Sequence, residues 1–454
     1  MAFRCGTGWG LGRADGVTFY PNMLWKSVGG VWLLLTGADA PGINAYAAEI
    51  PTGGFAETTI GSGYEPQPAL NPSAAYAHYG IWMRPGAFGG AGGKLRHAVF
   101  YEQTGGAAPN AIWGLGSEWV SSSTSNLGLI HGVSPNVFVG AKKLMGYTTW
   151  YWVNVIIRLS DMNAQLYVDD VLITSTGDNW EDPPSTTWCD GKISLYAAEF
   201  GSKSGHVWRV SSIILNDDLG SSMNARLGTT YRGVACCFPT CSVTGYEDFN
   251  HEETPYTHAD NKAYGNVDSD YDGDADWGYN GLNQNVNGAE LYQMAQIPSG
   301  TVEAVQLFVP CNLVTIGGFD YGVDYSTDRF IVYLEDPGGS PVENVPMVGG
   351  GPAISVSIAT AARAQAPGAQ AWTTALFNKL GAGVQRYNYA GYPNKKWRFW
   401  KMYAEVFGPS LGQPANNGVI TACLADAPPT VPHFAPIYPV AHVRKPEVVP
   451  YHHH

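Results

Sequence analysis

The densest group of residues with metal-binding chemistry is an acidic run near the middle of the chain. Between residues 268 and 276, aspartates alternate with other residues around a central glycine. Ca²⁺ takes six to eight oxygen ligands, and a glycine permits the sharp turn that such a loop needs. The glutamate that closes an EF-hand loop is missing, because its place is taken by Tyr279. The run therefore predicts either a solvated acidic turn or a Ca²⁺ site with these candidate ligands: Asp268, Asp270, Asp272 and Asp274.

Three tryptophans have the chemistry to bind sugars, since stacking on aromatic rings is how many lectin-like sandwiches hold glycans. They are Trp113, Trp119 and Trp180. The favoured alternative is that these rings pack in the core or at a subunit contact, because aromatic side chains are the usual anchors of both.

No arrangement of residues predicts a catalytic centre. Glycoside hydrolysis needs two carboxylates about 5–10 Å apart. Glu247 and Glu252 would point to opposite faces of a strand, and Glu253 would lie about 20 Å from Glu247. The Gly201–Gly205 segment has only the outline of a nucleophile elbow. The cysteines and histidines lack metal-ligand spacing. We therefore predict no catalytic residue, no enzymatic activity, and no cofactor other than Ca²⁺.

The composition favours β-structure and argues against nucleic-acid binding. The chain has 454 residues, of which only 14% are charged, with 56 Gly, 26 Tyr and 15 Trp. Aromatic residues suit a pleated surface, and glycine suits turns. The net charge of −13 leaves no basic stripe for a phosphate backbone. No apolar run reaches the roughly 20 residues of a membrane span, and the first residues do not resemble a signal peptide.

The pattern along the chain predicts two antiparallel β-sandwich (jelly-roll) modules in series. The clearest evidence is a β-meander over residues 150–173, in which Leu166 and Val168 alternate with polar positions. Trp372, Leu376 and Leu380, with Gly381 as the stop, predict one short helix over 371–380. The expected domain boundaries are a first module at 1–216, an arm between modules at 217–246, a second module at 247–408 and a Pro-rich extended tail at 409–454.

The meander carries a family resemblance. The strand beginning Trp150-Tyr-Trp-Val, followed by Leu166-Tyr-Val-Asp-Asp-Val, resembles the two central strands of laminin-G-like, concanavalin-A-like jelly rolls. In that pattern a glycine stands where this chain has Asp170. The resemblance implies a jelly roll for the first module.

The order of several other segments resembles a family of tailed-phage virion structural proteins. They include the opening Met1-Ala-Phe-Arg, the Asp217-Asp218-Leu-Gly segment and the Ala371-Trp-Thr segment, and together they extend over roughly residues 1–390. The resemblance implies a non-catalytic virion protein, made in the host cytoplasm, that acts as a capsid decoration, head-fibre or tail-associated subunit. Its expected partners are other virion proteins and further copies of itself, with a trimer preferred by analogy. Neither nucleic acid nor a membrane is expected as a partner.

The sequence is also compatible with two other functions. A glycan-binding adhesin on the same fold would use a host surface glycan as its partner, and a glycoside hydrolase is the third and least favoured alternative. Function inferred from a shared fold is analogy, so the discriminating observations are glycan binding and the release of new reducing ends.

Overall fold

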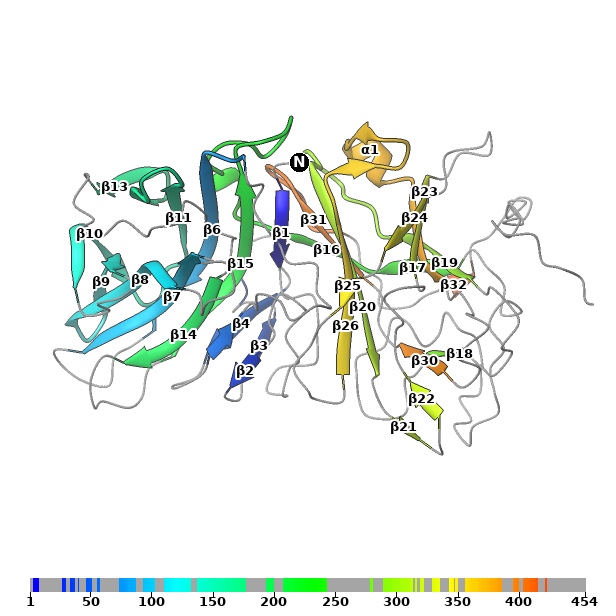
Figure 1. The fold of residues 1–454 in the computed structure, drawn as a ribbon, viewed down its shortest axis with the longest axis horizontal. Helices are drawn as coiled ribbons and strands as arrows, with labels where there is room; N and C mark the ends of the chain where they lie inside the picture. Colours follow the sequence, from blue (N-terminus) through cyan, green and yellow to red (C-terminus); the bar gives the residue numbers. More distant parts are fainter. Residues whose placement is uncertain are drawn as a thin grey trace, which may run out of the picture. The chain divides into compact units, whose positions relative to one another are not determined.

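In the described part of the chain, the computed structural model is mainly β, with strands that pair mostly antiparallel, which confirms the predicted fold class. It describes residues 3–7, 27–29, 33–36, 40, 46–50, 55–57, 73–86, 93–102, 110–131, 137–176, 193–199, 207–242, 278–280, 289–312, 315–316, 319–321, 329–334, 343–346, 348–349, 356–385, 395–399, 403–414 and 421–422. The strands form four large sheets and one small hairpin (Figure 1).

The first sheet has eight strands, in the order β13 (Val171–Ser175), β12 (Ala164–Val168), β11 (Tyr151–Arg158), β6 (Tyr76–Arg84), β15 (Trp208–Asp217), β4 (Tyr46–Ile50) and β3 (Leu33–Thr36), with β1 (Phe3–Thr7) also pairing with β15. The second sheet has seven, in the order β10 (Phe138–Gly146), β9 (Thr124–His131), β8 (Asn110–Ser121), β7 (Lys94–Glu102), β14 (Ile193–Glu199), β5 (Phe55–Glu57) and β2 (Ser27–Gly29).

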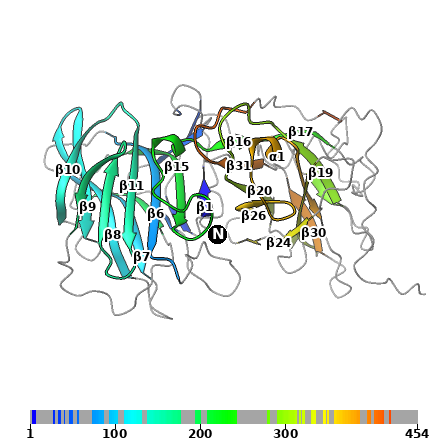
Figure 2. The same cartoon turned by 90° about the horizontal axis from the view of Figure 1, so that it is seen from above.

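These two sheets enclose one hydrophobic core, as expected for a sandwich (Figures 1 and 2). Every second residue of a strand faces the same side. Val153 and Val155 of β11 therefore point inward with Leu166 of β12, and they meet residues of the second sheet such as Leu115 and Leu127. The expected meander is present, since β11, β12 and β13 pair in sequence.

The third sheet has nine strands, in the order β16 (Ala235–Cys237), β31 (Tyr403–Phe407), β20 (Ala304–Asn312), β30 (Lys395–Phe399), β22 (Phe319–Tyr321) and β21 (Thr315–Ile316), joined by β18 (Gly278–Asn280), β25 (Val348–Gly349) and β26 (Val356–Arg363). The fourth has six, in the order β24 (Glu343–Pro346), β23 (Arg329–Leu334), β29 (Leu380–Gln385), β19 (Ala289–Met294), β17 (Pro239–Ser242) and β32 (Thr421–Ala422).

The third and fourth sheets share a second core. Val305 and Val406 of the third sheet pack in it with Phe330 and Tyr292 of the fourth. Strands β16 and β17 fall in the range expected to be an arm, and β32 falls in the range expected to be a tail; each pairs with a strand of these sheets. The tail beyond residue 422 lies outside the described residues.

The predicted helix is shorter than expected. Helix α1 covers only Thr374–Phe377, and β28 (Gln370–Ala371), paired with β27 (Gln365–Ala366), takes the start of the predicted range. Thr373 is extended and caps the helix by accepting a hydrogen bond from the Leu376 amide, so the helix cannot begin earlier.

The far end of the predicted helix belongs to a strand. Leu380 and Gly381 lie in β29, and Gly381 stands opposite Tyr333 of β23. The apolar spacing of Trp372 and Leu380 nevertheless corresponds to real burial, because both side chains lie in the second core.

The chain between β15 and β16 covers part of the outward face of the first sheet. Met223, Leu227 and Val234 pack there against Trp82 and Trp152. The Trp152 indole N–H donates to the Leu227 carbonyl at 2.9 Å. One short 3₁₀ turn, η2 (Thr229–Tyr231), interrupts this covering segment, which we define as residues 218–234.

Candidate functional site

The uncovered part of the same outward face forms the candidate site. A row of directly paired residues crosses five adjacent strands: Asn216, His78, Ile156, Gln165 and Ser175. Directly paired residues in antiparallel strands point to the same face. The row begins under the covering segment, where Asn216 is fully buried, and ends in the open at Ser175.

A shallow cavity of about 220 Å³ lies over the open end of this row. We call it the outer-face pocket, and its lining residues are Tyr76, Ile156, Arg158, Asn163, Gln165, Ser175 and Thr176. Tyr76 is 38% exposed although it is aromatic, and it stands opposite Arg158 in the strand pairing. The pocket therefore combines an accessible ring with several polar groups.

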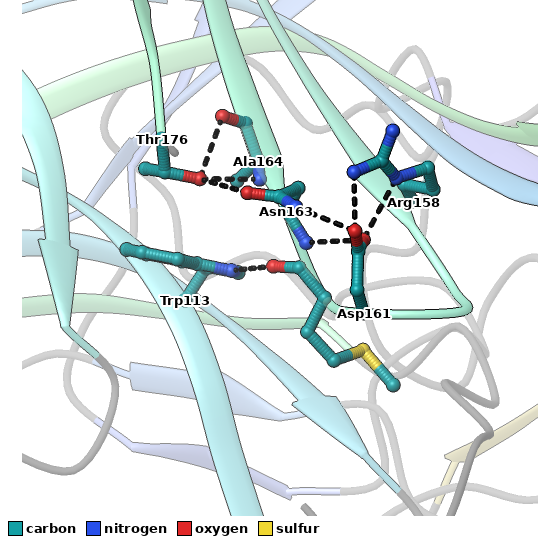
Figure 3. A network of polar contacts seen from close by, with 7 residues as sticks. Trp113, Arg158, Asp161, Asn163, Ala164 and Thr176 are labelled. Atoms are coloured by element: carbon teal, nitrogen blue, oxygen red, sulfur yellow. Dashed lines mark hydrogen bonds and ion pairs between the residues drawn. The ribbon is translucent and has the colours of Figure 1, made fainter. Parts of the chain in front are cut away.

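Arg158 and Asn163, which line the pocket, lie on either side of the turn between β11 and β12, and Figure 3 shows their polar contacts. Asp161 accepts hydrogen bonds from both Arg158 and Asn163, with Arg158 Nε to Asp161 Oδ1 at 2.8 Å and Asn163 Nδ2 to Asp161 Oδ2 at 2.6 Å. The hydrogen bond from Arg158 is the main reason that the pKa of Asp161 falls to about 2. Asp161 is therefore ionised at any neutral or mildly acidic pH.

The core side of the turn is also fixed. Met162 has the left-handed backbone angle φ 56°, which costs energy for any residue with a side chain. Its carbonyl accepts a 2.6 Å hydrogen bond from the Trp113 indole (Figure 3). Thr176 also holds the turn, because its hydroxyl accepts from the Ala164 amide and donates to Asn163 Oδ1.

The lining side chains divide into two groups. Asn163 and Thr176 use their polar atoms in contacts within the protein. By contrast, the hydroxyls of Tyr76 and Ser175 have no protein partner among the described residues, and the Gln165 side chain is engaged only through Oε1, which accepts from Tyr167 at 3.1 Å. These three side chains can hydrogen bond to a ligand without breaking a protein contact.

His78 lies at the boundary between the covered and the open part of the row. Its side chain is buried, and neither ring nitrogen has a hydrogen-bond partner among the described residues. Burial lowers the pKa of His78 to about 4, although the nearby Asp218 and Asp217 carboxylates act in the opposite direction. The imidazole is therefore neutral at neutral pH.

Of the residues predicted from the sequence, those that the structure describes, Trp113 and Trp119, do not line the outer-face pocket. Trp113 is 4% exposed and lies in the first core, so no face of its ring is open to a sugar. Trp119 is half-buried in β8. Trp180 and the candidate Ca²⁺ ligands Asp268, Asp270, Asp272 and Asp274 lie outside the described residues.

Two further findings concern metals and membranes. Within the described ranges, no three histidine, cysteine or acidic side chains are grouped as metal ligands. Cys236 and Cys237 are both buried, and burial raises the pKa of the Cys237 thiol. None of the helices in the described part of the chain has the length and apolarity needed to cross a bilayer.

Sequence reasoning missed the residues that line the pocket, although one signal pointed toward them. The alternation in β12 assigns Gln165 to the polar face of the sheet. Tyr76 could not be associated with it, because Tyr76 pairs with Arg158, which lies 82 positions further along the chain.

Comparison with known proteins identifies no family. No family model and no curated protein matches the chain. Among solved structures, a carbohydrate esterase from the Shiga toxin-encoding bacteriophage phi24B matches 42% of this chain and 89% of its own, with 11% identity and a TM-score of 0.31. An alginate lyase from Pseudomonas aeruginosa matches 40% of this chain and 85% of its own, with 10% identity and a TM-score of 0.29.

A third match comes from work on endo-acting O-glycanases of the human gut microbiota. It covers 48% of this chain and 100% of that one, with 13% identity and a TM-score of 0.30. The structures matched are described as carbohydrate-active enzymes, which contradicts the prediction that the chain has no enzymatic activity. That prediction is withdrawn.

Proposed function

We propose that this chain binds carbohydrate in the outer-face pocket. The observation that carries the proposal is the combination of the Tyr76 ring with unengaged polar groups on Gln165 and Ser175. A sugar presents C–H faces that pack on an aromatic ring and hydroxyls that both donate and accept hydrogen bonds. Binding sites of this kind pair an apolar surface with a few placed polar groups.

The size of the pocket suits a single sugar ring of a longer chain. Pockets that enclose a drug-sized ligand have volumes of roughly 300–1,000 Å³, whereas this one has about 220 Å³. Because its walls are the edge of a sheet and one turn, a polysaccharide can extend beyond it without entering the protein.

We further propose that the chain is part of a tailed-phage particle, assembled with other virion proteins and with copies of itself. The support for this is the ordered resemblance along residues 1–390. In such a particle a glycan site would serve attachment to the host surface. Mass spectrometry of purified particles, followed by location of the chain in their density map, tests this proposal separately from sugar binding.

The binding proposal is tested with a glycan array followed by titration calorimetry on the full chain. We expect Tyr76→Ala to weaken binding by at least tenfold, about 1.4 kcal/mol. We expect Gln165→Ala to weaken it by threefold to tenfold, since one hydrogen bond contributes about 1 kcal/mol.

Two matched variants serve as controls. Leu144→Ala removes an exposed apolar side chain from β10, and Gln370→Ala removes an exposed glutamine from β28. Both should bind as the wild type does. Equal binding by the wild type and Tyr76→Ala would contradict the proposal, as would the absence of any array signal. New reducing ends in the same samples would show that binding is accompanied by cleavage.

A further inference from the structure

The charge of the outer-face pocket is set by one ion pair. Among the described residues that line the pocket, Arg158 alone carries a formal charge at neutral pH. Its guanidinium is held by Asp161 through two hydrogen bonds, one from each of two nitrogens to a separate carboxylate oxygen. This fork-to-fork arrangement occupies the Nε/Nη2 edge of the guanidinium, one of the two edges with which arginine binds a carboxylate.

The partner carboxylate is itself fixed in place. Besides Arg158, Asp161 accepts hydrogen bonds from the Asn163 backbone amide at 3.2 Å and from its side-chain amide at 2.6 Å. With a pKa of about 2, owing chiefly to Arg158, Asp161 keeps its charge at neutral and mildly acidic pH. The arginine therefore stays neutralised.

Long-range electrostatics also disfavour the binding of an anionic glycan. The chain carries a net charge of −13. A polyanionic glycan approaching such a protein is repelled, and this repulsion weakens as salt screens it. A neutral glycan experiences neither this repulsion nor the cost of removing a carboxylate from water without a free cation to receive it.

From these observations we infer that the outer-face pocket selects an uncharged saccharide and discriminates against its uronate form, with Asp161 as the residue that sets this specificity. The inference rests on the proposed function. Gln165, Ser175 and Tyr76 are the polar contacts that remain for the sugar, and all three are neutral groups suited to hydroxyls.

The test uses matched pairs of oligosaccharides: gluco-, manno- and galacto-hexaoses and the same hexaoses oxidised to carboxylates at C6. Affinities are measured by calorimetry for the wild-type chain, for Asp161→Asn and for the double variant Arg158→Gln/Asp161→Asn. Asparagine retains an oxygen that can accept from the Asn163 amide, and melting curves establish that each variant is folded.

We expect the wild type to bind the neutral member of a pair at least tenfold more tightly than the carboxylated member. Asp161→Asn should reduce this ratio at least fivefold, because it removes the carboxylate that neutralises the Arg158 charge. The double variant should restore the ratio, because it removes that charge as well. In 0.5 M salt the wild-type ratio should narrow but stay above one.

Two different failures can be told apart. If the wild type binds a carboxylated hexaose as tightly as its neutral partner, or if Asp161→Asn leaves the ratio unchanged, the specificity inference is wrong while sugar binding stands. If no member of any pair binds, both the inference and the proposed function are overturned.

Discussion

At the scale of single residues, His78 is buried in surroundings that disfavour its protonated form. It lies on the outward face of the first sheet, directly opposite Asn216 and Ile156, with both ring nitrogens lacking a described partner. Asn154 and Asn216 nearby each have a buried side-chain oxygen without a partner as well. A proton added to His78 would therefore place a charge where burial disfavours it.

This environment predicts a loss of stability in mild acid. The pKa of His78 is about 4 in the folded chain against an ordinary 6.5. As the pH falls from 6.5 toward 4, the unfolded chain takes up a proton that the folded chain does not, so the free energy of unfolding decreases. Between pH 7.5 and pH 5 we expect His78 to account for a decrease of about 2 kcal/mol.

The measurement is urea unfolding at several pH values for the wild type and for His78→Gln, which is similar in size and does not titrate in this range. The variant should lose much less stability than the wild type over the same interval. Parallel curves for the two proteins would contradict the assignment to His78. The lowered pKa values of Asp161 and Asp170 matter only below this interval.

Residue types alone could suggest what binds sugars but not where. Tryptophan chemistry suits sugar binding, but Trp113 packs in the first core and donates a hydrogen bond to the β11–β12 turn. The exposed ring at the pocket is Tyr76, at the start of a strand that otherwise is buried. Exposure of a ring depends on which strands are neighbours, and no local pattern encodes that.

At the scale of elements, the Asp169-Asp170 turn fixes the covering segment. Both residues have left-handed backbones, with φ 47° and 68°, as the two-residue hairpin between β12 and β13 requires. The Asp170 carboxylate accepts hydrogen bonds from the amide and the hydroxyl of Thr229 at 3.0 and 2.7 Å, and pairs with Arg226. Burial acts to raise its pKa, but the bonds from Thr229 and Arg226 outweigh burial and lower it.

We predict that Asp170→Gly, which restores the residue of the jelly-roll pattern, loosens the covering segment. Glycine relieves the cost of a positive φ, but every bond to Thr229 and Arg226 is lost, and we expect a net loss of about 1 kcal/mol. Hydrogen exchange at the Thr229 amide should accelerate. The exchange rate of Asp170→Asn, which keeps a hydrogen-bond acceptor and tolerates this backbone conformation, should lie between those of the wild type and the glycine variant. A glycine variant whose Thr229 amide is as protected from exchange as that of the wild type would contradict the prediction.

Gly381 shows why the predicted helix stop was wrong. It lies in β29 with the Tyr333 ring across it, and a Cβ there would stand 2.0 Å from the ring. Gly381→Ala should therefore reduce the free energy of unfolding by about 2 kcal/mol, the usual cost of overpacking. Gly146→Ala is the control, because its Cβ would meet nothing closer than 3.7 Å. Thermal melts that ranked the two variants equally would contradict this explanation.

The elements themselves were predicted best where both neighbours are close in sequence. The meander of β11, β12 and β13 follows from alternation and a tight turn, and it is present as expected. Long-range pairs were out of reach: β6 lies between β11 and β15, and no local signal predicts that arrangement. The candidate site lies on β6, β11, β12 and β13 together, so it shares that limit.

At the scale of the whole molecule, residues on the outward face of the first sheet pack against buried residues of the third sheet. Trp82, Trp152 and Ile214 of that face form one cluster with Ala304 and Phe407 of the third sheet. Beside it, the Tyr231 hydroxyl donates to Glu303 at 3.0 Å, and burial followed by the Glu303 charge raises the pKa of Tyr231. Apolar contacts of this kind make the stability of one sheet depend on the other.

This shared cluster predicts that residues 3–422 unfold in a single cooperative transition. Calorimetry should give equal van't Hoff and calorimetric enthalpies for the main transition, the criterion for two-state behaviour. Phe407→Ala, which removes a fully buried ring, should cost about 3–5 kcal/mol and lower the midpoint of the whole transition. Phe377→Ala is the matched control, because its ring is equally buried but lies only in the second core. If the sandwiches are coupled, both variants should shift one common transition. The contrary result would be two separate transitions, with Phe377→Ala shifting only one of them and Phe407→Ala failing to shift both. It would mean that the cluster does not couple the sandwiches and that they unfold independently.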